Sequence, residues 1–511
     1  MSNSRQWRHA GSALGIAAMT ASGSFAVMAT APKHVLAHTK STPVSITAEL
    51  PPNSGPISSK QNADLKHFTL VYEHQHPGVT VNWIDNTFSS ITPANAALVT
   101  RASGGADPDI VWEQYNPVNS GSIPQGIILN LTPYLRQKDP YDTQYPNWLA
   151  TFKAADYPYM RNPAGQYDVI LSSDVATGMF YNKADWKKAG IATPPTTWAQ
   201  LLVDFKKLKS AKVTPFLFAT GGINCNPSWW ERKMSSSLLA SAIKKIDVNH
   251  AQVLTGLDVA TGVAKGTLTM KNPAYAEVWK LLGQLRPYLA SGGVNYGACS
   301  TPTQTTPPLS AQSLLIKGQV ATLWGGSWWG PQLDAQGFTG KWGVFPVPTV
   351  TKATTPFATG VNATGTVGGP NGVGQWSITT PKADSTMTPA KTKVVVNFLE
   401  YLTSPKVLST WMVGEAGGPA YVPLVKGATL PKGASSLDTL LPKRKPPVTI
   451  EGLLDDVLTA NGSDAGGRLL EEYVSGSISF NAFASQWDTI MKTAAQQWAS
   501  LNHVKIPGLG A

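Results

Sequence analysis

Short apolar runs alternate with longer polar stretches along the chain, as is typical of proteins that mix strands and helices. The runs VSITAEL (44–50), VTVNWI (79–84) and DIVW (109–112) have the length and composition of buried strands. The polar stretches between them predict helices that end near residues 73 and 103. Strands joined by helices predict crossover connections, and therefore an α/β fold with a mainly parallel sheet.

The same alternation continues in a second region of the chain. VILSS (169–173), GMFYN (178–182) and VTPFLF (213–218) predict further strands. Thr197, followed three residues later by Gln200, is a capping box that predicts the start of a helix. Further helix starts are predicted at Asn272-Pro273 and Thr388-Pro389, because proline is well tolerated in a first turn.

Residues 1–37 have the layout of a secretory signal peptide. Arg5 and Arg8 precede a weakly apolar run from Ala13 to Ala31, and Val35-Leu36-Ala37 follows with a small residue at the expected cut. An uncleaved membrane anchor is the alternative, although the run contains several serines and threonines. We expect an exported protein, periplasmic or at the cell surface, and without a lipid-anchoring cysteine near the cut.

Composition and charge narrow the classes of function. The 511 residues are 42% hydrophobic and 14% charged, and their 17 Trp, 15 Tyr and 14 Phe indicate a folded chain. Lys and Arg exceed Asp and Glu by 41 to 30, a net charge of +11, but no run of five basic residues occurs. Nucleic-acid binding is therefore not expected.

The two cysteines, Cys225 and Cys299, most simply form one disulfide in an exported chain, and two buried free thiols are the alternative. His74 and His76 are interpreted as surface residues, because no metal-ligand spacing such as HExxH or CxxC accompanies them. We expect no metal and no cofactor.

Several segments, in the same order along the chain, resemble the extracellular solute-binding proteins of bacterial ABC sugar importers, the maltose-binding-protein-like family 1. They are PDIVW (108–112), ILNLTPYL (128–135), FYNKADWKKAGIATPPTTWAQL (180–201), KGQVATLWGGSWWGPQL (317–333), FLEYLTSPKVLSTWM (398–412) and GGPAYVP (417–423).

The resemblance implies a two-lobed periplasmic-binding-protein-like fold of type II. Each lobe is a mainly parallel sheet flanked by helices, and several strands form the hinge. It assigns residues 43–166 and 373–420 to lobe 1, residues 168–350 and 425–511 to lobe 2, and residues 351–372 to a connector that crosses the hinge.

The resemblance also implies a sugar site between the lobes. A pyranose has an apolar face and a rim of hydroxyls, so its site needs a flat aromatic ring and planar polar groups. Trp328 matches the family's stacking aromatic, and Trp229 and Trp230 match an aromatic loop that lines the cleft; a place in the core is the alternative for each. The other candidates lie after DIVW, at the first crossover and at the re-entry into lobe 1: Glu113, Tyr115, Asn116, Ser173, Asp174, Gln375 and Trp376.

The expected partners are a neutral mono- or oligosaccharide and the membrane permease of an ABC importer, with the protein itself a monomer. The alternatives are an exported sugar sensor or adhesin, and a secreted glycan-acting enzyme. The paired acids Asp455-Asp456 and Glu471-Glu472 give the enzyme little support, because adjacent residues on a helix point about 100° apart and cannot flank one glycosidic bond. We therefore expect no catalytic residue.

Overall fold

The computed structural model of the chain describes residues 43–50, 56–85, 91–113, 126–162, 164–174, 176–219, 226–248, 254–290, 311–360, 375–411, 422–429, 435–440, 457 and 460–510. The expected signal peptide and both cysteines lie outside these residues, so the predictions for them stay predictions.

The first sheet combines strands that are far apart in sequence. β1 (Val44–Glu49) lies between β2 (Val79–Ile84) and β3 (Ile110–Glu113), and all three run parallel, as the alternating pattern predicted. β9 (Gln375–Ile378) pairs antiparallel with β3 and with β4 (Ile170–Leu171) at the other edge. The sheet therefore joins the N-terminal region to a segment more than 200 residues later.

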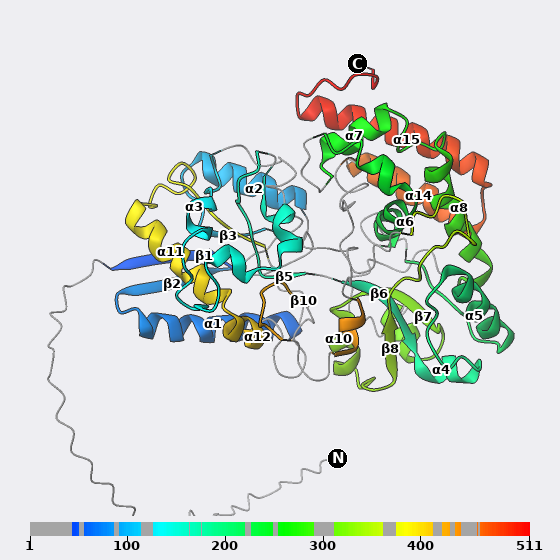
Figure 1. Ribbon diagram of the computed structural model, residues 1–511, viewed down its shortest axis with the longest axis horizontal. Helices are drawn as coiled ribbons and strands as arrows, with labels where there is room; N and C mark the ends of the chain where they lie inside the picture. Colours follow the sequence, from blue (N-terminus) through cyan, green and yellow to red (C-terminus); the bar gives the residue numbers. More distant parts are fainter. Residues whose placement is uncertain are drawn as a thin grey trace, which may run out of the picture. The chain divides into compact units, whose positions relative to one another are not determined.

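Helices lie on both sides of this sheet; Figure 1 shows α1 along one side and α2 along the other. The helices of this part of the chain are α1 (Pro56–Gln75), α2 (Ile91–Ser103), α3 (Thr132–Leu135), α11 (Pro389–Leu402) and α12 (Pro405–Trp411).

The second sheet differs from the parallel sheet that was expected. β6 (Thr177–Asn182) lies between β7 (Thr322–Gly326) and β8 (Trp342–Phe345), and both pairs are antiparallel. The predicted strand VTPFLF contributes only parallel bridges at Phe216 and Leu217. Pro215 explains why this segment pairs so sparsely, since proline has no N–H to donate to a ladder.

The helices of this second part of the chain include several predicted starts. The capping box at Thr197 is present, with the Thr197 N–H donating to Gln200 Oε1 over 3.1 Å, and Asn272 caps α8. These helices are α4 (Lys183–Lys188), α5 (Trp198–Ser210), α6 (Asn226–Ile243), α7 (Gly256–Ala264), α8 (Pro273–Leu285), α9 (Ala311–Ile316), α10 (Trp329–Ala335), α14 (Ala460–Ser475) and α15 (Phe480–Leu501).

The buried apolar side chains form two cores. The first core runs from Ile46 to Leu171 and resumes from Trp376 to Val425. The second core takes the buried residues from Ala176 to Ala358 and from Leu437 to Leu509. The chain therefore passes between the cores three times. Beside the first and third passages, β5 (Ser173–Asp174) pairs antiparallel with β10 (Val422–Pro423).

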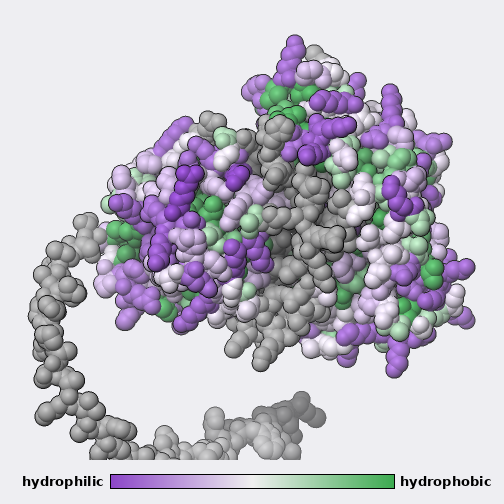
Figure 2. Space-filling view, viewed as in Figure 1, coloured by the Kyte–Doolittle hydropathy of each residue, from purple (hydrophilic) through white to green (hydrophobic). Residues whose placement is uncertain are grey.

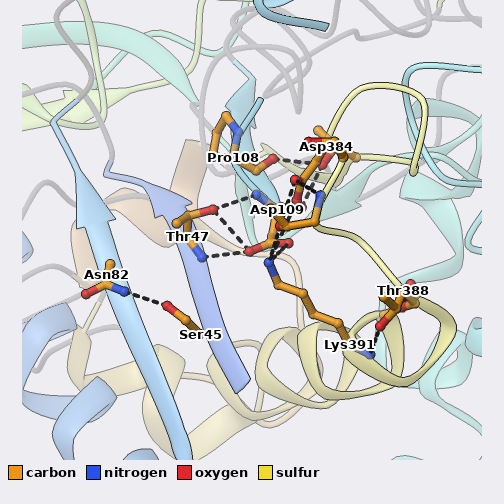
Figure 3. A network of polar contacts seen from close by, with 12 residues as sticks. Ser45, Thr47, Asn82, Pro108, Asp109, Asp384, Thr388 and Lys391 are labelled. Carbon is orange, nitrogen blue, oxygen red and sulfur yellow. Dashed lines mark hydrogen bonds and ion pairs between the residues drawn. The ribbon is translucent and has the colours of Figure 1, made fainter. Parts of the chain in front are cut away.

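A buried charge network fastens α11 to the first sheet (Figure 3). The side chain of Asp109 has no exposed surface, and its Oδ1 forms an ion pair with Lys391 Nζ at 2.7 Å. Its other oxygen accepts the N–H and the hydroxyl of Thr47 over 2.8 and 3.0 Å. Burial and the facing Asp384 raise the pKa of Asp109. The network ties β1, the residue before β3 and the first turn of α11 together.

A carboxylate accepts a backbone hydrogen bond from β2, the edge strand of the first sheet. The N–H of Val81 on β2 donates to Oε1 of Glu73 over 2.7 Å, and Glu73 lies near the end of α1. The indole N–H of Trp83 donates to the hydroxyl of Thr69 on the same helix. Two polar side chains of α1 therefore accept hydrogen bonds from residues of this edge strand.

Hydrophobic residues on the face shown in Figure 2 form small patches scattered among hydrophilic ones. Among the described residues, no helix has the length and apolar character needed to cross a bilayer.

Candidate functional site

The tryptophan pair after β7 divides between two environments. β7 ends at Gly326, Ser327 follows, and Trp328 is the N-cap residue of α10. Trp329 is 2% exposed, and its ring centroid lies 5.8 Å from that of Phe180 inside the second core. Trp328 is only partly buried and contacts both cores. It is therefore the member of the pair that keeps indole surface accessible.

The second tryptophan pair lies on a helix, which corrects the loop expected there. Pro227 is in the first turn of α6, and the side chain of Asn226 accepts the N–H of Ala219 over 2.8 Å. Trp229 follows in that turn and is 6% exposed. Its ring centroid lies 6.0 Å from that of Trp328, with the two planes at 73°. Trp229 and Trp328 thus form an edge-to-face pair.

Trp230, the next residue of α6, is turned about 100° around the helix axis from Trp229. It has no exposed surface, its indole N–H donates to the carbonyl of Val278 over 2.9 Å, and its ring packs against Trp198. Trp230 is therefore enclosed in the second core in this structure.

The candidates on the first sheet lie on β3 and β9, and only those on β9 have described side chains. Gln375 and Trp376 on β9 are buried, and the Trp376 ring meets that of Trp112 at 4.6 Å and 89°. Glu113 ends β3 and pairs with Gln375 through the backbone, but its side chain lies outside the described residues. Tyr115 and Asn116 lie outside them altogether.

The crossover candidates lie on β5. Ser173 is fully buried and pairs with Pro423, and Asp174 pairs with Val422. The side chain of Asp174 is not among those described. Within the described residues, the hydroxyl of Ser173 and that of Ser327, beside Trp328, have no hydrogen-bond partner. Both serines are fully buried in this structure, so neither hydroxyl reaches the surface.

A buried run of charges on α6 was missed by the sequence analysis. Glu231, Arg232 and Lys233 follow the tryptophan pair directly and are 7% exposed or less. Burial lowers the pKa of Lys233 to about 7. Lys233 is four residues after Trp229, so the two share a helix face. Assigning a helix from Pro227 onward would have revealed this spacing.

The described candidate positions offer flat aromatic surface and neutral polar groups. Trp328, Trp229, Ser173 and Gln375 carry no charge. Among the described residues, no three His, Cys, Asp or Glu side chains are grouped so that they could hold a metal ion. The accessible indole surface of Trp328 suits contact with an apolar ligand face.

Comparison with known proteins places the chain in a structural context. The family model described as "Bacterial extracellular solute-binding protein" matches residues 55–408. No curated protein matches the sequence.

Solved structures share the fold at low sequence identity. A chitin oligosaccharide binding protein is 17% identical, with a TM-score of 0.60 over 89% of this chain and 99% of its own. RafE from Streptococcus pneumoniae is 17% identical, with a TM-score of 0.59 over 89% and 99%. The sugar-binding protein MalE from Xanthomonas citri is 15% identical, with a TM-score of 0.60 over 90% and 100%. These likenesses confirm the two-lobed periplasmic-binding-protein fold.

Proposed function

Because the chain belongs to the bacterial extracellular solute-binding protein family, we propose that it captures a neutral mono- or oligosaccharide outside the cytoplasm and delivers it to the permease of an ABC importer. The family binds solutes and does not transform them, which favours a binding protein over the secreted glycan-acting enzyme. The names of the similar structures, which include a chitin oligosaccharide and raffinose, favour a saccharide as the solute.

The observation that carries the proposal is the partly buried indole of Trp328. It contacts both cores, which we propose to be the two lobes; the first core extends to Leu171 and Val425, a few residues beyond the boundaries expected at 166 and 420. A sugar ring stacked on Trp328 would therefore touch both lobes. Closure around a ligand requires such contacts, since a ligand shifts an equilibrium only by its differential affinity for the two states.

The candidates whose side chains are described carry no charge, which supports a neutral sugar, whereas Glu113 and Asp174 are carboxylates whose side chains lie outside that set. The indole of Trp328 offers its face to the C–H groups of a pyranose. An acidic sugar would need a cation beside this indole. The buried Lys233 makes a uronate-containing saccharide the comparison that tests neutrality most directly.

The proposal is tested by a thermal-shift screen against mono-, di- and oligosaccharides, both neutral and acidic. A disaccharide of about 23 heavy atoms, at roughly 0.3 kcal/mol per atom, binds with about 7 kcal/mol, or a Kd near ten micromolar. At about 100 times that concentration the native state gains about 2.7 kcal/mol, which shifts the melting temperature measurably. A flat response to every saccharide would reject the proposed function, and a response to uronates alone would reject neutrality.

Trp328→Ala is expected to weaken binding of the saccharide found in the screen by roughly tenfold, because it removes the stacking face. Titration of intrinsic tryptophan fluorescence measures the affinity. Thermal unfolding of the variant without ligand checks that it is folded. Unchanged affinity in a folded variant would remove Trp328 from the site.

Closure is a separate expectation. The radius of gyration from small-angle scattering should be smaller with the saccharide than without it, since the lobes close on the ligand. Equal radii at saturating ligand would reject the clamp and leave saccharide binding in place.

A further inference from the structure

Two glycines end β7 directly before the tryptophan pair. An ideal Cβ built on Gly326 would overlap Cζ3, Cη2 and Cε3 of Trp328, and one built on Gly325 would overlap Cε3 and Cδ2 of Trp329. Each indole therefore lies directly on the backbone of one glycine.

Backbone conformation does not account for these glycines. Fourteen glycines of the described chain have positive φ values, which other residues adopt rarely, and neither Gly325 nor Gly326 is among them. Both are ordinary strand residues, and each pairs with β6, Gly325 with Gly178 and Gly326 with Thr177. What the two positions require is the space that a side chain would fill.

The two glycines serve opposite faces of the strand, because successive positions of a strand point to opposite sides. Gly325 faces the side where Trp329 is enclosed with Phe180 in the second core. Gly326 faces the side where the edge-to-face pair of Trp328 and Trp229 lies. One glycine therefore admits a core side chain, and the other admits the proposed stacking platform.

We propose that Gly326 is a positioning residue for saccharide binding, which sets the height of the Trp328 ring above β7 while Trp229 sets its tilt. This inference rests on the proposed function. A methyl group at position 326 displaces the six-membered ring of the indole, since all three overlapped atoms belong to that ring. Trp229 on one side and the contacts with both cores limit where the ring can move. The displaced face no longer matches a sugar held by the polar groups around it.

The test compares Gly326→Ala with its neighbour Gly325→Ala, the same substitution on the opposite face. Gly326→Ala is expected to weaken saccharide binding by roughly fivefold or more and to change the near-UV circular dichroism of the Trp229–Trp328 pair. Gly325→Ala is expected to lower the melting temperature through Trp329, with the affinity of the folded protein within about twofold of native.

A third arm separates positioning from general loss of structure. Trp328→Phe removes the ring atoms that the new methyl group would overlap, so Gly326→Ala introduced into Trp328→Phe should change affinity by less than about twofold. If Gly326→Ala alone does not fold, the double variant is used in its place. It should fold, because the phenylalanine relieves the overlap with the new methyl group.

The outcomes distinguish this inference from the proposed function. If Trp328→Ala weakens binding but Gly326→Ala does not, the positioning role is wrong and the proposed function stands. An equal loss from Gly326→Ala in the Trp and Phe backgrounds also overturns the positioning role. If no saccharide binds the native protein, the proposed function fails, and an unchanged near-UV spectrum in Gly326→Ala then rejects the placement of the ring as well.

Discussion

Replacing Lys391 by methionine is expected to destabilise the folded protein by about 3 to 5 kcal/mol at neutral pH. The methionine keeps most of the apolar stem of lysine and removes the ammonium group that lies 2.7 Å from Asp109. Asp109 then stays fully buried without its cation, and Asp384 still faces it. Unfolding in urea, extrapolated to water, measures the loss of free energy.

Lys393→Met is the matched control, because Lys393 is exposed on the same helix two residues later. We expect it to change the free energy of unfolding by less than about 0.5 kcal/mol. The loss from Lys391→Met should shrink at acidic pH, where Asp109 takes up a proton and needs no cation. A loss of similar size in both variants would show that the Asp109–Lys391 pair contributes nothing of its own.

Replacing Glu400 by glutamine is expected to stabilise the protein by up to about 3 kcal/mol at pH 8 and to have little effect at pH 4. Glu400 is 7% exposed on α11, and burial, with the nearby charge of Asp139, raises its pKa from 4.5 to about 7. Asn397 donates to Glu400 over 3.3 Å and accepts the hydroxyls of Tyr72 and Tyr141. The Asn397 hydrogen bond lowers the pKa of Glu400, but burial and Asp139 outweigh it and favour a neutral side chain at position 400.

The sign of the pH dependence follows from the direction of the shift. Glu400 ionises near pH 4.5 in the unfolded chain but near pH 7 in the folded one, so the native protein loses stability as the pH rises between these values. Asp139, whose pKa burial raises to about 6, adds a loss in the same direction. Denaturation midpoints from pH 4 to pH 8 measure the effect, with the exposed Glu472→Gln as control. A Glu400→Gln gain that does not grow with pH would contradict this assignment.

Local sequence patterns predicted those elements whose signals are local. The capping box at Thr197, the prolines after Asn272 and Thr388, and the alternating strands of the first sheet all act within a few residues, and the structure confirms them. The loop expected around Trp229 was wrong, because Pro227 starts a helix there. Tryptophan content drew attention to the site but did not indicate which ring would be enclosed.

Partners that are distant in sequence could not be predicted in the same way. Asp109 pairs with Lys391, which is 282 positions later, and Glu400 interacts with Asp139, which is 261 positions earlier. Trp328 and Trp329 lie against opposite faces of β7. Which of these faces is enclosed in the core depends on how β7 is assembled with β6 in the sheet. The residue types were visible in the sequence, whereas their neighbours depend on the assembled sheets.

The carboxylate of Glu73, bonded to Val81 on β2, bears on how the protein behaves at high concentration. An open row of backbone donors invites the corresponding strand of another molecule, and repetition of that event leads to fibrils. A negative side chain already seated on one of those donors must be expelled before a second strand can add. The Glu73 carboxylate therefore opposes the addition of a second strand at this position of the sheet edge.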